Sequence, residues 1–283
     1  MLLPLAGCAK GEKPGPSAFS APPAAALDAN LTALEVKFGA RLGVYAVNTG
    51  TGAVVEHRAD ERFAFCSTFK VLAAAAVLSR NPSSHLDSRV AYTEADLMEN
   101  APITTKNVAK MTIRELCDAA IRVSDGTAGN LLVRDLGGPA ELTAYTRELG
   151  DEVFRMDRVE PEITEATPGD PRDTTSPRAY AADLRAIVLG EALPVEKRDV
   201  IVDLLKRNLT GDERIRAGMP EGWVVADKTG TGDYGTANDF AVVWPPSGDP
   251  LVIGIMSSMD AEDAEYDQAL LAEAAKYAAE TLT

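Results

Sequence analysis

The sequence predicts a two-lobe α/β fold, in which an antiparallel five-stranded sheet with flanking helices lies beside an all-helical lobe. Strand patterns occur near both ends of the chain, helical patterns occupy the middle, and 283 residues are enough for two interleaved lobes. The simplest packing joins both ends of the chain into one sheet. A cleft is then expected between the sheet and the helical lobe.

The first elements of the folded part are a helix at residues 27–38 and strands at residues 42–48 and 53–57. The Thr-Gly-Thr-Gly stretch at 49–52 supplies a tight turn between the strands, which predicts a hairpin.

The middle of the chain is helical. Residues 67–79 are apolar all round, which is typical of a helix buried at the centre of a domain. Thr112 and Glu115 form a capping-box pattern at the start of a helix that ends at Val123. Ser176 followed by proline is the start signal of another helix. Further helical segments are expected at 138–150, 176–190 and 194–208.

The last third returns to strands, at residues 223–227, 237–244 and 251–257, and closes with an amphipathic helix at 265–282. One segment, residues 155–173, is acidic and proline-rich and shows no periodicity. An irregular loop of that length inside a compact domain is usually functional or disordered.

These elements divide the chain into an N-terminal segment at 1–25 and a folded domain at 26–283. Residues 26–60 and 209–283 are assigned to the α/β lobe, and residues 61–208 to the helical lobe.

The composition restricts the possible functions. The formal net charge is −15, and an acidic surface repels phosphate backbones, so no nucleic-acid partner is expected. The sequence contains no run of about 18 apolar residues, so no membrane-spanning helix is predicted. Three cysteines without a C-x-x-C spacing predict neither a disulfide framework nor a metal site. We expect no cofactor, a small-molecule substrate and a monomer.

The N-terminal segment carries a possible export signal. Leu5-Ala6-Gly7-Cys8 resembles the lipobox of bacterial lipoproteins, in which the cysteine is lipidated after signal cleavage. The preceding segment is short for a complete signal peptide. Residues 9–25 are rich in Pro, Gly, Ala and Ser, as in a flexible tether. An exported protein is expected, either attached to the cell envelope through lipid on Cys8 or secreted.

Three short motifs carry chemistry. Ser67 and Lys70 lie three residues apart at the start of the buried helix, so the hydroxyl and the amine can meet on one face. Burial would lower the lysine pKa and favour an activated nucleophile. An S-x-x-K match alone is weak, because roughly one is expected by chance in a chain of this length, and a plain helix cap explains it equally well.

The second motif, Ser124-Asp125-Gly126, could be another helix-cap turn. The third motif, Lys228-Thr229-Gly230-Thr231, lies at the predicted end of a strand and could be a simple strand terminus. A lysine with neighbouring hydroxyls is also a good binding site for a carboxylate.

In this order, the three motifs resemble the signature of class A serine β-lactamases and penicillin-binding proteins. The resemblance runs from about residue 27 to the C-terminus, and the Ser-Asp-Gly motif is similar to the mycobacterial and actinobacterial branch. It implies hydrolysis of the β-lactam amide bond of penicillins and cephalosporins through an acyl-serine, which gives antibiotic resistance. Other matching stretches are at 41–45, 65–70, 130–132, 135–139 and 227–235.

The resemblance also gives the loop at 155–173 a role. Glu160-Pro161-Glu162 resembles the start of the family's Ω-loop, which implies that Glu160 is the general base that activates the hydrolytic water. Arg158 and Asp173 match the ion pair that closes the neck of that loop.

The remaining roles are implied in the same way. Ser67 attacks the lactam carbonyl, and its proton passes either to Lys70 or through a water to Glu160. Ser124 relays a proton to the leaving nitrogen. Backbone N–H groups of Ser67 and Thr231 form the oxyanion hole. The substrate-binding set is Lys228, Thr229, Gly230 and Thr231, with Arg214, Gly126, Asn100 and Thr164.

Several members of this set depart from the usual family pattern. Gly126 stands where asparagine is common and Asn100 where an aromatic residue is common, so a wide cleft is expected. Thr164 replaces an asparagine that helps to hold the water, which could slow deacylation. Arg214 matches the position from which the actinobacterial branch reaches the substrate carboxylate, although a solvated surface charge is the alternative.

Two rival functions remain open. A D-alanyl-D-alanine peptidase shares the Ser-Lys chemistry but usually lacks the Ω-loop glutamate, and a β-lactam sensor would stay acylated. The histidines, His57 and His85, have no Ser or Cys partner in a motif, so a Ser-His-Asp mechanism is poorly supported. Cys66 and Cys117 are expected to be free, buried thiols.

Overall fold

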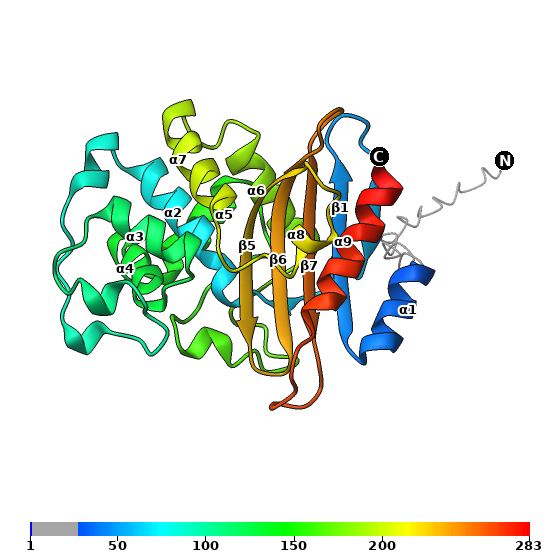
Figure 1. Ribbon diagram of the computed structural model, residues 1–283, viewed down its shortest axis with the longest axis horizontal. Helices are drawn as coiled ribbons and strands as arrows, with labels where there is room; N and C mark the ends of the chain where they lie inside the picture. The colour runs from blue at the N-terminus through cyan, green and yellow to red at the C-terminus, as the bar shows by residue number, and fades with distance from the viewer. Residues whose placement is uncertain (2–27) are drawn as a thin grey trace.

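A computed structural model describes Met1 and residues 28–283. The predicted lipid site Cys8 and the predicted tether at 9–25 therefore lie outside the described residues. The centre of the fold is a five-stranded antiparallel sheet with the strand order β2-β1-β7-β6-β5, so strands from both ends of the chain meet in one sheet as expected (Figure 1). Its strands are β1 (Arg41–Asn48), β2 (Val54–His57), β5 (Val224–Gly232), β6 (Thr236–Trp244) and β7 (Leu251–Ser258).

Helices cover both faces of the sheet and form a separate layer beyond β5 (Figure 1). A short second sheet pairs β3 (Phe63–Ala64) with β4 (Thr174–Thr175). The α-helices are α1 (Ala29–Phe38), α2 (Phe69–Arg80), α3 (Ile113–Arg122), α4 (Gly126–Leu136), α5 (Pro139–Glu148), α6 (Pro177–Val188), α7 (Val195–Lys206), α8 (Ile215–Gly218) and α9 (Gln268–Leu282). The 3₁₀ turns are η1 (Cys66–Thr68), η2 (Ser83–Asp87), η3 (Glu94–Asp96), η4 (Thr104–Lys106) and η5 (Glu162–Thr164).

Two apolar cores lie on opposite faces of the sheet. Leu42 and Ile253 on one face pack with Leu271 of α9, and α1 lies beside α9 on that side (Figure 1). On the other face, Phe240 of β6 packs against Tyr180 of α6, with ring centroids 4.0 Å apart. This second core continues into the helical layer, so the sheet and the helices share one packed interior.

The helix α2 is buried along almost its whole length, as its apolar composition predicts. Ser67 does not belong to α2 itself but lies in the turn η1, directly before the first α-helical residue. The hydroxyl of Tyr180 donates a hydrogen bond of 2.5 Å to the Thr68 carbonyl. Helix α6 therefore holds the turn that carries Ser67 against the sheet.

Local capping signals place the helix starts. Thr112 and Glu115 form the predicted capping box of α3. Ser176 accepts a hydrogen bond from Ala179 N at the start of α6. Helix α9 begins at Gln268 rather than at residue 265, because Asp267 caps it.

Helix α4 was not among the expected helical segments, but the helix-cap turn left open for the second motif is present, because Asp125 caps α4 by accepting a hydrogen bond from Ala128 N. One expectation about the strands was wrong. The third motif does not end its strand, since β5 continues to Gly232, paired with β6 throughout. Cross-strand hydrogen bonding therefore holds Lys228 and Thr231 in a continuous ladder.

The irregular segment 155–173 is ordered at its neck and tip. Arg158 Nε and Asp173 Oδ2 are 2.6 Å apart, as the predicted ion pair requires. Arg155 forms an isolated β-bridge with Thr174, and η5 lies at the tip. The segment is a closed loop that returns to its starting point beside β4.

Candidate active site

The nucleophile candidate lies in a constrained turn. Ser67 is 8% exposed, and Cys66 before it has a φ of 47°, in the left-handed region that side chains rarely adopt. Ser124 has a φ of 57°. Non-glycine residues in this region are held there by the surrounding packing and cluster at functional sites.

Ser67, Lys70 and Glu160 form a closed hydrogen-bonded triangle. The Ser67 hydroxyl donates to Glu160 Oε1 at 2.6 Å, and Lys70 Nζ donates to Ser67 Oγ at 2.8 Å. Lys70 Nζ also donates to Glu160 Oε1 at 2.7 Å. The hydroxyl proton therefore points at a carboxylate, while an ammonium supports the serine oxygen.

Burial controls the charge of both lysines at the site. Lys70 is fully buried, and desolvation lowers its pKa, although the Glu160 carboxylate opposes this shift. Burial and then repulsion from Lys70 lower the pKa of Lys228 well below its ordinary value. Both ammonium groups consequently release a proton more readily than an exposed lysine.

Ser124 connects these two lysines. Lys228 Nζ donates to Ser124 Oγ at 3.0 Å, and Lys70 Nζ lies 3.4 Å from the same oxygen. Lys70 also donates to the Ser124 carbonyl at 2.8 Å. Lys228 is 1% exposed and donates to the Thr229 carbonyl, so its charge lies beneath the cleft rather than in it.

Strand β5 forms one wall of the site. A Cβ added at Gly230 would lie 2.6 Å from the Phe65 carbonyl and 3.3 Å from Ser67 N, so only glycine allows the strand this close to the turn. The close approach places the backbone of β5 beside the Ser67 amide.

Arg214 is not a solvated surface charge, because it is 3% exposed. Its guanidinium donates to the carbonyls of Gly230 and Asn238, both at 2.8 Å, and to Thr231 Oγ1 at 2.8 Å. Arg214 therefore reaches β5 from the segment before α8 and adds a buried positive charge to this wall.

Asn100 and Thr164 line the same cleft, which has a volume of about 480 Å³, whereas Gly126 is buried and does not line it. Asn100 is exposed, and its carbonyl accepts a hydrogen bond of 2.7 Å from Gly126 N. The Thr164 hydroxyl donates to the Pro161 carbonyl at 2.7 Å, which leaves its oxygen free to accept another hydrogen bond. Of the residues expected at the site, the cleft lining includes Ser67, Asn100, Ser124, Glu160, Thr164, Arg214, Thr229, Gly230 and Thr231.

Sequence reasoning missed several residues of the site. Thr210 pairs its hydroxyl with that of Thr229 at 2.6 Å, and Gln268 accepts from Arg214 Nε at 3.1 Å. Neither belongs to a short motif, so no local signal identifies them. The Asn130 side chain hydrogen-bonds the Glu160 backbone, and its place in a matched stretch was the available signal.

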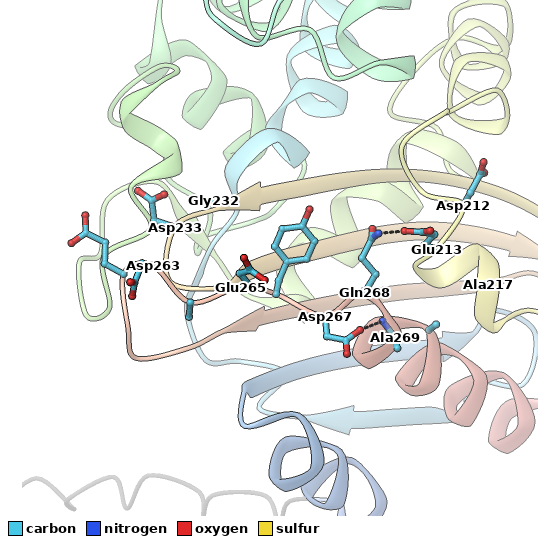
Figure 2. Close-up of a pocket in the computed structure, with 14 residues that line it drawn as sticks. Asp212, Glu213, Ala217, Gly232, Asp233, Asp263, Glu265, Asp267, Gln268 and Ala269 are labelled. Carbon is cyan, nitrogen blue, oxygen red and sulfur yellow. Dashed lines mark hydrogen bonds between the residues drawn. The ribbon is translucent and has the colours of Figure 1, made fainter.

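A larger, acidic hollow of about 1200 Å³ lies beside the cleft and shares Tyr266 and Gln268 with it. Figure 2 shows carboxylate side chains on the loop before α9 and on the turn after β5, with Gln268 hydrogen-bonded to Glu213 on the segment before α8. It contains neither Ser67 nor Lys70 and is therefore separate from the candidate reaction centre. Its acidic residues are Asp212, Glu213, Asp233, Glu262, Asp263, Glu265 and Asp267.

The remaining candidates do not line the cleft. Buried His57 lies 3.3 Å from Glu35, and His85 lies 2.9 Å from Asp135. Cys66 and Cys117 are free and buried, as predicted. Within residues 28–283, no three His, Cys, Asp or Glu side chains gather as metal ligands, and no helix has the length and apolar character to cross a bilayer.

Comparison with known proteins agrees with this geometry. Residues 26–282 match the family described as the beta-lactamase enzyme family. A beta-lactamase of Mycobacterium tuberculosis is 53% identical over 97% of this chain and 92% of its own length. One from Amycolatopsis lactamdurans is 53% identical over 95% and 89%. Solved beta-lactamase structures from Desulfarculus baarsii and from a halotolerant bacterium superpose with TM-scores of 0.87 and 0.88, at 48% and 47% identity, each covering 90% of this chain and 98% of the other.

Proposed function

The chain belongs to the beta-lactamase enzyme family, and from that premise we propose that it hydrolyses penicillins and cephalosporins through an acyl-enzyme on Ser67, which Glu160 then resolves. It is a class A serine β-lactamase, and this activity gives resistance to the antibiotic. The observation that carries the proposal is the 2.6 Å hydrogen bond from Ser67 Oγ to Glu160 Oε1. It joins a nucleophile and a carboxylate base in one buried site.

In the acylation step, Ser67 Oγ attacks the lactam carbonyl and loses its proton. Two groups lie within reach of that proton, Glu160 Oε1 at 2.6 Å and Lys70 Nζ at 2.8 Å. The oxygen that becomes negatively charged is stabilised by the backbone N–H groups of Ser67 and Thr231, in the manner of an oxyanion hole.

Opening of the ring requires a proton on the departing nitrogen. Ser124 supplies it from its hydroxyl, and the neighbouring ammonium groups of Lys70 and Lys228 restore that proton. The lowered pKa values of both lysines favour this transfer.

The wall formed by β5 and Arg214 holds the substrate carboxylate. Thr229 and Thr231 offer hydroxyls, Gly230 leaves room for close approach, and the guanidinium of Arg214 and the ammonium of Lys228 provide positive charge from behind. Charge-assisted hydrogen bonds of this kind orient a carboxylate strongly.

In the deacylation step, Glu160 removes a proton from the water that attacks the acyl-serine. Thr164 can help to hold this water through the free lone pairs of its hydroxyl. This step separates a hydrolase from a protein that remains acylated.

The variant Glu160→Gln tests the proposal. We expect a covalent adduct on Ser67 to accumulate on exposure to a penicillin, visible by intact-protein mass. Glu162→Gln, an exposed substitution on the same loop, is the matched control and should turn over normally. Normal turnover by Glu160→Gln would show that Glu160 is not the general base of deacylation.

The two rival functions make different predictions. A chromogenic cephalosporin distinguishes many turnovers per protein, expected here, from the single stoichiometric burst of a sensor. Release of D-alanine from a peptide that ends in D-Ala-D-Ala would instead indicate a peptidase.

The open rim suggests tolerance of bulky substrates. Asn100 is exposed in the lining of the cleft, and Gly126, which is buried and donates its N–H to the Asn100 carbonyl, adds no side chain behind it. We expect Gly126→Asn to change the ratio of rates for penicillins and bulky cephalosporins. An unchanged ratio would contradict a role for this position in the width of the cleft.

Class A β-lactamases are generally exported, and we propose that this chain is exported as well. The proposal includes a lipid anchor on Cys8, the tether at 9–25, a catalytic domain at 26–283 and a monomer that binds no nucleic acid. Metabolic labelling with a fatty acid, compared between the natural chain and Cys8→Ser, distinguishes a lipoprotein from a secreted enzyme.

A further inference from the structure

Arg214 carries a buried charge whose hydrogen bonds all end on uncharged oxygens within the part of the chain that the structure describes. The guanidinium is 3% exposed, and its four acceptors are Gln268 Oε1, Thr231 Oγ1 and the carbonyls of Gly230 and Asn238. A buried cation that is hydrogen-bonded to neutral groups keeps its attraction for an incoming anion. The position of Arg214 must therefore be fixed by contacts other than an ion pair.

The backbone directly after Arg214 is fixed by a side chain from the sheet. Asp239 Oδ2 accepts a hydrogen bond of 3.0 Å from Ile215 N, the first amide of α8. Arg214 precedes α8 and offers no side-chain cap of its own, so this amide takes its acceptor from β6, 24 positions further along the chain. A buried backbone N–H needs such an acceptor, which makes Asp239 an anchor for the start of α8.

Both ends of α8 are held in place. At the N-terminal end, Asp239 lies on β6, which pairs with β5 at Thr229 and with β7 at Ile255. At the other end, a Cβ added at Gly218 would lie 2.3 Å from the Ala272 carbonyl of α9, so this helix and α9 are in close contact. Helix α8 therefore rests on a strand at one end and on a helix at the other.

The surroundings of Asp239 favour its neutral form. The side chain is fully buried, and its Oδ1 has no hydrogen-bond partner among the described residues. Burial and then the neighbouring Asp227 carboxylate raise the pKa of Asp239 well above its ordinary value, although Arg214 and Lys228 oppose this shift. A neutral carboxylic acid still accepts the hydrogen bond from Ile215, but it does not cancel the charge of Arg214.

Resting on the proposed function, we propose that Asp239 is a positioning residue for binding of the substrate carboxylate. Through its hydrogen bond to Ile215 it holds Arg214 against β5, and it does so without neutralising the guanidinium. Asp239 does not line the cleft, so it acts through Arg214 and not by contact with the substrate.

The variant Asp239→Ala tests this role, because it removes the acceptor of the Ile215 amide. For a penicillin with a free carboxylate, we expect KM to rise by about 3- to 10-fold, the range that corresponds to one lost hydrogen bond. The kcat value should change by less than about twofold, and so should KM for the methyl ester of the same penicillin. Equal increases in KM for acid and ester, or no increase for the acid, would overturn the proposal.

The conservative variant Asp239→Asn separates the hydrogen bond from the charge. Its amide oxygen can accept from Ile215 N and is neutral at every pH, so KM for the acid should stay within about twofold of the natural value. An increase as large as that of Asp239→Ala would show that the carboxylate acts through its charge, which contradicts the proposal.

The Arg214→Ala background supplies the control. There the guanidinium is absent, so Asp239→Ala should change KM for the acid by less than about twofold. The same increase in both backgrounds would show that Asp239 acts elsewhere in the fold.

A further measurement keeps the proposal testable even if Asp239→Ala fails to fold. The ¹³C chemical shift of the Asp239 carboxyl, assigned by comparison with Asp239→Asn, should be that of a neutral acid at pH 7. The shift of an ionised carboxylate would refute a neutral anchor. Turnover of the penicillin by the natural protein tests the proposed function separately, because none of these outcomes depends on whether Asp239 takes part.

Discussion

The side chain of Asn130 holds the backbone of Glu160 by two hydrogen bonds. Its Nδ2 donates to the Glu160 carbonyl at 2.8 Å, and its Oδ1 accepts from the Glu160 amide at 3.0 Å. Helix α4 thereby positions a loop residue that lies 30 residues further along the chain.

The first prediction follows from this pair. Asn130→Ala removes both hydrogen bonds, so Glu160 loses its anchor while the rest of α4 remains. We expect deacylation to slow by about 10- to 100-fold, since general-base catalysis requires hydrogen-bond reach. Acyl-enzyme should accumulate in a burst experiment. Asn107→Ala, which removes a side-chain hydrogen bond remote from Glu160, is the control and should deacylate normally.

The neck of the Ω-loop gives the second prediction. Asp173 is 1% exposed and accepts hydrogen bonds from the backbone and side chain of Arg158. Asp173→Asn removes the charge opposite Arg158, which should lower the free energy of unfolding by about 1–3 kcal/mol and slow deacylation. Urea unfolding and single-turnover kinetics measure the two effects. Asp170→Asn breaks the more exposed pair with Arg172 and should cost at most about 1 kcal/mol; equal losses would contradict a special role for the neck.

A buried carboxyl predicts a pH-dependent stability. Burial and the neighbouring Asp151 carboxylate raise the pKa of Asp183 to about 9. In the unfolded chain this pKa is about 3.9. Between these two values the folded protein binds a proton that the unfolded chain has released, so this group makes stability fall as the pH rises from about 4 to about 9.

Asp183→Asn removes this titration, because the amide is neutral at every pH. The natural protein should lose stability from this group as the pH rises from 5 to 8, whereas the variant should not. The difference in the free energy of unfolding, measured by urea unfolding at each pH, should therefore shift in favour of the variant. Asp199→Asn, an exposed substitution, should show no such trend. A parallel pH dependence in the natural protein and Asp183→Asn would rule out this origin.

Arg214 gives the fourth prediction. Arg214→Ala removes the buried positive charge behind Thr231, so KM should rise by about 10- to 100-fold for a substrate that carries a free carboxylate. A substrate with that carboxylate methylated should show a much smaller change. Arg214→Lys keeps the charge but loses the planar guanidinium, so its KM should lie between that of the natural protein and that of Arg214→Ala. Equal effects on acid and ester would indicate that Arg214 only supports the strand.

Much of the fold follows from local signals in the sequence. The capping box at Thr112 and the proline after Ser176 place α3 and α6, since a helix start depends on residues within one turn. Helix α4 was not among the predicted helices, because Gly126 and Gly129 weaken its helical signal. The structure explains Gly129, because a Cβ at this position would lie 2.6 Å from the Lys70 Cε atom.

The sequence by itself determined the alternation of strands and helices, the three motifs and the net charge, because each depends on residue type and on near neighbours. Only the tertiary structure decided that Ser67 contacts Glu160 across 93 positions in the chain, that Arg214 is buried behind β5, and that Gly126 faces a carboxylate. Distances between side chains on different elements are set by how those elements pack, and a packed interior leaves so little space that a Cβ at Gly126 would collide with the Glu160 carboxylate.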